Sequence, residues 1–198
     1  MFTGIVIATG RVASIRDKGG DLELGIEAGA LDLKRVAVGD SVSVSGVCLT
    51  ATRIDAGVFH ADVSRETLDK TTLGTFGAGR RVNLEPSLRA GDPLGGHLVS
   101  GHVDAVGTLT DLVRDARSWR LRFELPQVLM RYVAPKGSIC IDGVSLTVNE
   151  VAGRCFEVNV IPHTHEVTTL GELAAGGGAN VEIDLVARYL ERLVAKSG

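Results

Sequence analysis

The segment Gly46-Val47-Cys48-Leu49-Thr50 recurs, with one substitution, as Gly143-Val144-Ser145-Leu146-Thr147, which lies 97 residues further along the chain. The same spacing extends well beyond these two segments. When residues 1–74 are compared with residues 98–171 without gaps, 20 positions are identical, whereas about five or six would match by chance in a chain so rich in Gly and Val. The chain is therefore a tandem duplication of one structural unit.

Each copy is predicted to be all-β. Polar and apolar residues alternate at 41–44, as in a half-buried strand, and turn signals such as Lys18-Gly19-Gly20-Asp21 separate the short runs. Short strands with abundant Gly favour a small antiparallel barrel in each copy. Brief helical turns are expected near 30–35 and 65–70.

The ends of the two copies set the expected domain boundaries. After two additional residues in the second copy, Val82-Asn83-Leu84-Glu85 is expected to pair with Val181-Glu182-Ile183-Asp184, and the Gly- and Pro-rich segment 86–96 is expected to be a linker. These features predict barrels at residues 1–97 and 98–184, followed by a separate tail at residues 185–198.

The tail is predicted to be a helix from Val186 to Ala195. Its apolar residues Val186, Tyr189, Leu190 and Leu193 have the spacing of a single helical stripe. A helix this short needs a packing partner. Either it folds back on its own barrel or it pairs with the tails of neighbouring subunits.

Composition and charge exclude several classes of protein. The net charge of −3 comes without a basic stripe, so we expect neither nucleic-acid binding nor membrane attachment. The apolar start at residues 1–7 is too short for a signal peptide or a membrane span, and a cytoplasmic location is expected. The three cysteines lack the spacing of a zinc site or a disulfide framework, so we expect no bound metal.

Four motifs in this order closely resemble riboflavin synthase. They are the opening Met-Phe-Thr-Gly-Ile-Val, the paired Gly-Val-[Cys/Ser]-Leu-Thr segments, the run from Leu94 to Asp104, and Ile161-Pro162-His163-Thr164. The resemblance implies two six-stranded Greek-key barrels and a C-terminal helix that forms a homotrimer. It also implies transfer of four carbons between two molecules of 6,7-dimethyl-8-ribityllumazine, giving riboflavin and 5-amino-6-ribitylaminouracil without a cofactor.

The resemblance also implies a set of ligand contacts in each copy. In this family the first barrel of one subunit faces the second barrel of its neighbour, so that two lumazines meet in one site. The first pocket is expected to contain Gly4, Ile5, Val6, Cys48, Leu49, Thr50, Asp62, Val63, Ser64, Arg65, Glu66 and Thr67. The second is expected to contain Gly101, His102, Val103, Ser145, Leu146, Thr147, Asn159, Val160, Ile161, Pro162, His163 and Thr164, with Lys136 reaching a neighbouring chain's ligand.

The candidate catalytic residues are His102, Ser145, Cys48, Thr147 and Asp184, and whether Asp184 touches ligand stays open. His102 is proposed to act with Ser145 as base or relay for the acidic 7-methyl group of one lumazine, because an imidazole titrates near neutral pH. Cys48 is proposed to serve the acceptor lumazine. His97 is assigned to the linker.

Two other functions remain open on the sequence alone. One is a relative such as the lumazine proteins, which bind a fluorophore without turnover. The other is a flavin-binding barrel of a reductase, although the Arg-x-Tyr-Ser segment and the nucleotide-binding Gly-x-Gly-x-x-Gly unit of such enzymes are missing. Association with lumazine synthase is a further possibility that the sequence does not decide.

Overall fold

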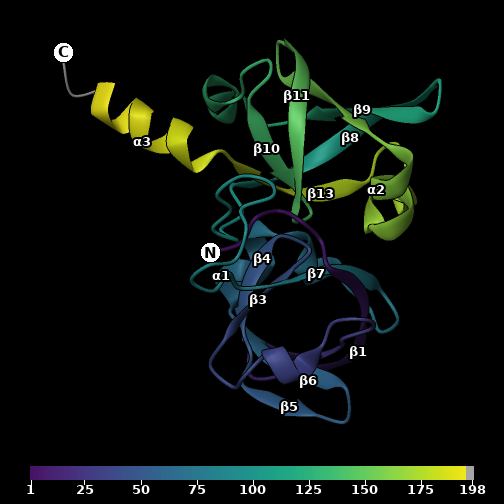
Figure 1. The fold of residues 1–198 in the computed structure, drawn as a ribbon, viewed down its shortest axis with the longest axis vertical. Coiled ribbons are helices and arrows are strands. Elements are labelled where there is room, and N and C mark those ends of the chain that lie inside the picture. The colour runs from purple at the N-terminus through teal and green to yellow at the C-terminus, as the bar shows by residue number, and fades with distance from the viewer. Residues whose placement is uncertain (195–198) are drawn as a thin grey trace.

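Two β-barrels, one from each copy of the repeat, account for most of the computed structural model, which describes residues 1–194. In Figure 1 the first barrel, purple and blue, lies below the green second barrel, and the C-terminal helix projects from the second barrel. The prediction of a duplicated all-β fold with a C-terminal helix is confirmed. None of the helices within the described range is long and apolar enough to cross a membrane.

The elements of the two copies follow each other in the same order. The first copy contains β1 (Ala8–Asp17), β2 (Leu22–Glu27), the 3-10 helix η1 (Leu33–Arg35), β3 (Ser41–Val44), β4 (Val47–Thr50), β5 (Arg53–Asp55), β6 (Val58–Val63), α1 (Arg65–Lys70), the 3-10 helix η2 (Thr72–Thr75) and β7 (Arg81–Pro86). The second contains β8 (Ala105–Asp115), β9 (Ser118–Glu124), η3 (Gln127–Tyr132), β10 (Ser138–Ile141), β11 (Val144–Ala152), β12 (Cys155–Val160), α2 (Pro162–Val167), η4 (Thr169–Glu172) and β13 (Gly178–Ile183), and α3 (Leu185–Val194) follows. The two helical turns expected in the first copy are present as η1 and α1.

The strands are antiparallel and follow a Greek-key course. In the second copy the order β10-β11-β12-β9-β8-β13 closes into a six-stranded barrel. The first copy has the order β4-β3-β7-β1-β2-β6-β5, in which β4 and β5 together take the course of the single strand β11. The two copies differ at Ala51-Thr52. The strand is interrupted there in the first copy, whereas β11 continues through the equivalent point with a bulge between Val148 and Glu150.

The register of the last strands contradicts the expected two-residue insertion. Ala8 pairs with Leu84 in the first barrel, and Ala105 pairs with Val181 in the second. Both partners are therefore offset by 97 residues, and the alignment of Val82 with Val181 was wrong. Because side chains alternate between the two faces of a strand, the offset that preserves the buried positions is the correct one. It makes Asn83 equivalent to Asn180 and Glu85 equivalent to Glu182.

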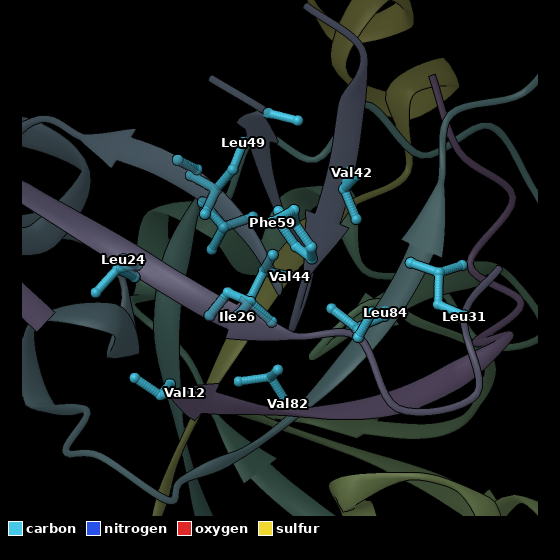
Figure 2. Packing of buried hydrophobic residues seen from close by; sticks show 14 of the residues in the cluster. Val12, Leu24, Ile26, Leu31, Val42, Val44, Leu49, Phe59, Val82 and Leu84 are labelled. Atoms are coloured by element: carbon cyan, nitrogen blue, oxygen red, sulfur yellow. The ribbon is translucent and has the colours of Figure 1, made fainter. Parts of the chain in front are cut away.

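Each barrel has its own apolar core. In the first barrel, Phe59, Ile26, Val44 and Leu84 converge on the barrel interior, as Figure 2 shows. Phe156 is the equivalent of Phe59 in the second core, and both side chains are fully or almost fully buried. Truncation of such a buried Phe to Ala typically destabilises a protein by about 3–5 kcal/mol, so these side chains are major contributors to the stability of each barrel.

The barrels meet through a symmetric set of buried amide hydrogen bonds. The Asn83 side chain donates to the Asp142 carbonyl at 2.8 Å and accepts from the Thr169 backbone N–H at 2.8 Å. Asn180 does the same with the Ser45 carbonyl and the Thr72 N–H, again at 2.8 Å. A buried amide whose donor and acceptor are both paired fixes orientation. The two barrels are therefore held in one defined arrangement.

Within residues 1–194, the C-terminal helix α3 forms hydrogen bonds with the second barrel through its polar side chains. Arg188 donates to Asp104 at 2.7 and 2.8 Å, and Glu191 accepts from Arg131 at 2.8 Å. The predicted apolar stripe is exposed, with Val186, Tyr189, Leu190 and Leu193 at 54–69% exposure. The stripe does not fold back on its own barrel within the part of the chain that is described, and Ala195 lies outside that part.

Candidate functional site

Equivalent segments of the two barrels carry the expected ligand-contacting residues. In the first barrel Cys48–Thr50 lies on β4, and residues 62–67 run from the end of β6 into α1. In the second barrel Ser145–Thr147 lies on β11, and residues 159–164 run from the end of β12 into α2. Since β4 contacts β6 and β11 pairs with β12, each pair of segments lies on one side of its barrel.

The helix that follows each site begins differently in the two copies. Ser64 caps α1, where its hydroxyl accepts from the Thr67 N–H at 3.3 Å and lies 3.1 Å from the Thr67 hydroxyl. At the equivalent position Ile161 is 54% exposed and gives no side-chain cap, and Pro162 starts α2 instead. The first site is therefore richer in hydroxyl groups at this edge, and the second presents an apolar surface.

The leading segment of each copy crosses to the opposite barrel. The Gly4 carbonyl accepts from the Ser145 N–H at 2.7 Å, and Val6 packs against the second core. In the mirror arrangement, the Gly101 carbonyl accepts from the Cys48 N–H at 2.8 Å, and Val103 packs against the first core. Segments 4–6 and 101–103 thus each lie against the opposite barrel, whereas the sequence analysis assigns each of them to the pocket of its own copy.

The crossing depends on a close approach that only glycine permits. Gly4 and Gly101 have φ values of 74° and 79°, in the left-handed region. A Cβ atom on Gly4 would lie 2.6 Å from Ser145 Cβ, and one on Gly101 would lie 2.6 Å from Cys48 Cβ. Cys48 and Ser145 are thus each packed directly against the backbone of a crossing segment.

Ser145 has a histidine partner that the sequence reasoning missed. His97 Nδ1 lies 2.7 Å from Ser145 Oγ, and His97 is 9% exposed. Its Nε2 atom is buried and has no hydrogen-bond partner in residues 1–194. Burial lowers the pKa of His97, and the nearby charge of Asp184 opposes that effect. Burial therefore favours the neutral form of the His97 imidazole, which lies within hydrogen-bonding distance of the Ser145 hydroxyl.

His97 does lie in the segment that links β7 to β8, but this segment contributes a hydrogen bond to Ser145 that the sequence analysis does not predict. The sequence signal that could have found it is the preceding Gly95-Gly96 pair. A Cβ atom on Gly96 would lie 2.1 Å from the Thr3 carbonyl oxygen and 2.9 Å from Ser145 Cβ. The chain needs glycine here because the backbone passes closely between two other segments before it presents the imidazole.

Cys48 occupies the position equivalent to Ser145 but in different surroundings. It is half-buried and packs against a small cluster of Phe2, Val99 and Cys140. Its thiol makes no hydrogen bond to the described residues. The deeply buried Cys140 has a pKa raised well above the usual value by burial, which leaves Cys48 as the better candidate nucleophile of the two.

His102 lies with Cys48 rather than with Ser145. It follows Gly101, its backbone N–H donates to Ser100 Oγ at 3.3 Å, and it is exposed. The proposed pairing of His102 with Ser145 in one pocket is therefore wrong within this chain, because the crossing segments exchange their places.

Asp184 and Lys136 take positions at the margin of these sites. Asp184 follows β13, and its carboxylate accepts from the Val186 N–H at 2.9 Å at the start of α3. Its charge also acts on the pKa of His97. Lys136 is exposed and has a φ of 68°, the conformation that Gly39 adopts at the equivalent position with a φ of 95°.

Comparison with known proteins matches both halves of the chain to one domain family. A family model described as "Lumazine binding domain" matches residues 3–87 and again residues 100–184. The two matches are offset by 97 residues, in agreement with the register of the last strands. Among solved structures, LumP complexed with riboflavin superposes with a TM-score of 0.86 at 27% identity, covering 92% of this chain and 99% of LumP. LumP complexed with 6,7-dimethyl-8-(1'-D-ribityl) lumazine gives a TM-score of 0.83 at 26% identity, with the same coverage.

Curated relatives agree over nearly the whole chain. The riboflavin synthase of Photobacterium phosphoreum is 41% identical over 194 residues, which cover 98% of this chain and 89% of that protein. The riboflavin synthase of Mycobacterium bovis is 42% identical over 208 residues and covers both chains completely. On two domain matches and two similarities over nearly the whole chain, this chain belongs to the riboflavin synthase family.

Proposed function

We propose that this chain converts two molecules of 6,7-dimethyl-8-ribityllumazine into riboflavin and 5-amino-6-ribitylaminouracil. The observation that carries the proposal is the presence of two equivalent sites, one on each barrel, which share Thr50 and Thr147 but differ at Cys48 and Ser145. A reaction between two identical molecules needs two similar binding sites. Holding both molecules in contact makes their reaction effectively unimolecular.

The residues at the sites suit a flat ring that carries a polyhydroxyl chain. Thr50 and Thr147 are exposed at equivalent strand positions, and Ser64 and Thr67 add hydroxyl groups beside the first of them. Hydroxyl groups both donate and accept, as the ribityl chain requires. The residues expected from the family resemblance remain the proposed ligand contacts, now with the leading segments exchanged between the barrels.

The two sites are proposed to play different parts in the reaction. In the second barrel, neutral His97 can take a proton through Ser145 from the 7-methyl group of the donor lumazine, and Asp184 can stabilise the imidazolium that forms. In the first barrel, Cys48 and His102 face the acceptor lumazine. This division revises the earlier pairing of His102 with Ser145.

The chain is further proposed to act as a homotrimer joined through α3. The exposed apolar stripe on α3 supports this, because Tyr189 and Leu193 are 63% and 69% exposed although the helix is bonded to its own barrel along the other side. In that assembly the first barrel of one subunit faces the second barrel of the next. Association with lumazine synthase and a cytoplasmic location stay predictions.

One assay tests the proposed function. Purified protein is incubated with lumazine in the presence of a chelator, and riboflavin and lumazine are quantified by absorbance after chromatography. The expected result is one riboflavin for every two lumazines consumed, over many turnovers and at a rate that chelation leaves unchanged. Fluorescence that saturates at a fixed ratio of ligand to protein, without riboflavin, would identify a binding protein. A rate restored only by added metal would refute the cofactor-free reaction.

A further inference from the structure

Two buried carboxylates, Glu85 on β7 and Glu182 on β13, occupy equivalent positions that the site described above does not use. They are 5% and 2% exposed. A carboxylate in such a position is costly unless its oxygens are fully hydrogen-bonded. An apolar residue would fill the same position without that cost, so the presence of glutamate in both barrels calls for a specific partner.

Both glutamates have the same kind of partner, a hydroxyl residue followed by glycine. One oxygen of Glu85 accepts from the Thr3 N–H at 2.6 Å and the Thr3 hydroxyl at 2.7 Å, and the other accepts from the Gly4 N–H at 3.0 Å. One oxygen of Glu182 accepts from the Ser100 N–H at 2.7 Å and the Ser100 hydroxyl at 2.6 Å. Its other oxygen accepts from the Gly101 N–H at 2.8 Å.

The glycines held in this way are those whose carbonyls bond to the opposite barrel. Gly101 is held at both ends: its N–H donates to the Glu182 carboxylate, and its carbonyl accepts from the Cys48 N–H at 2.8 Å. Gly4 is clamped in the same way between Glu85 and Ser145. Each carboxylate is therefore linked through a single glycine to a reactive residue of the other barrel: Glu182 to Cys48, and Glu85 to Ser145.

We infer that Glu182 and Glu85 are positioning residues that act across the molecule. Glu182, in the second barrel, sets the place of residues 101–103 against Cys48 in the first barrel. Glu85, in the first barrel, sets the place of residues 4–6 against Ser145 in the second. This inference rests on the proposed function, because it assigns the two glutamates to the geometry of the proposed reaction sites.

The crossing gives the inference a signature that ordinary destabilisation does not produce. In Glu182→Gln, the amide oxygen can still accept from Ser100, but the amide nitrogen faces the Gly101 N–H, and two donors cannot pair. Loss of that charge-assisted hydrogen bond should accelerate amide exchange at Cys48 by about tenfold or more. Exchange at Ser145 should be unchanged. Glu85→Gln should give the reverse pattern, with faster exchange at Ser145 and unchanged exchange at Cys48.

The experiment measures amide hydrogen exchange by mass spectrometry on the full chain, in peptides that contain Cys48 and Ser145, together with kcat/KM for lumazine. Glu124→Gln is the control, because Glu124 lies on β9 of the second barrel and, among the described residues, forms an ion pair with Arg154 alone. It should leave both peptides and turnover at the parent level. Both buried-glutamate variants should lower kcat/KM by about tenfold or more.

Two outcomes separate the possible failures. If the parent forms no riboflavin, the proposed function falls, while the crossed exchange pattern still tests the positioning. If the parent turns over but Glu182→Gln changes only the strands of its own barrel, the inference is overturned. Should Glu182→Gln fail to fold, Ser100→Ala takes its place, because it removes one of the three hydrogen bonds that Glu182 accepts. Ser100→Ala must accelerate amide exchange at Cys48 more than at Ser145. Equal exchange rates in the parent and in Ser100→Ala would also overturn the inference.

Discussion

Replacing Asp142 by asparagine should make the stability of this protein less dependent on pH. Asp142 is 5% exposed at the interface between the barrels, and one of its carboxylate oxygens accepts from the Asn180 N–H at 2.8 Å. Burial raises the pKa of this carboxyl from 3.8 to about 7. The folded protein therefore binds a proton at Asp142 more tightly than the unfolded chain does.

The sign and size of the effect follow from that difference. The stabilising contribution of the protonated carboxyl is complete below about pH 4, is lost as the pH rises from about 4 to about 7, and then stays constant. A pKa difference of about three pH units corresponds to about 4 kcal/mol. Asparagine keeps the acceptor for Asn180 and tolerates the φ of 46° at this position. Asp142→Asn should thus match the parent near pH 4 and exceed its stability by up to about 4 kcal/mol at pH 8.

Urea unfolding of both proteins at several values between pH 4 and pH 8 measures this difference. Changes at other carboxyl groups cancel, because both proteins carry them. Asp69→Asn is the control, since Asp69 is exposed on α1 and its replacement should leave the difference near zero throughout. A stability difference for Asp142→Asn that stays constant across the whole pH range would refute the reasoning.

Three further predictions concern the reaction and the assembly. His97→Gln should slow both turnover and exchange of the 7-methyl protons of lumazine with deuterated water by about a hundredfold or more. Cys48→Ser should slow turnover but leave the exchange largely intact. NMR measures both rates, and the opposite pattern would mean that the roles of the two sites are reversed. Deleting residues 186–198 should convert the oligomer to a monomer and abolish turnover, and sedimentation that shows an unchanged oligomer would contradict the role of α3. A fragment of residues 1–97 lacks residues 101–103, the segment that faces Cys48. Its affinity for lumazine should therefore rise with protein concentration, because a second copy of the fragment can supply residues 1–6 in their place. Affinity that does not vary with concentration would speak against the crossing.

Much of the fold could be predicted from the sequence because the repeat and the alternating strands are local patterns. The paired segments 46–50 and 143–147 establish the duplication, and the apolar stripe from Val186 to Leu193 indicates the helix. The register of the last strands was missed for a physical reason. Matching Val82 with Val181 by residue type favoured an insertion, whereas the barrel preserves the positions that point into its interior.

The composition of each site could not be predicted in the same way. Nothing in the order of residues along the chain shows that two similar halves exchange their leading segments, because either half offers the same pairing surface. For that reason the sequence alone pairs His102 with Ser145 and does not reveal the contact between His97 and Ser145. Glu85 and Glu182 were also missed, since the incorrect register concealed their equivalence.

The exchanged leading segments bear on how such a protein can arise. Several backbone and amide contacts across the interface occur in equivalent pairs, including Gly4 with Ser145 and Gly101 with Cys48, and Asn83 with Thr169 and Asn180 with Thr72. A chain that carried only one copy could therefore have made these paired contacts with a second identical chain, as a symmetric dimer. Fusion of the two genes would preserve that dimer inside one polypeptide. It would also free each half to mutate alone, so that one position could become cysteine while its twin became serine.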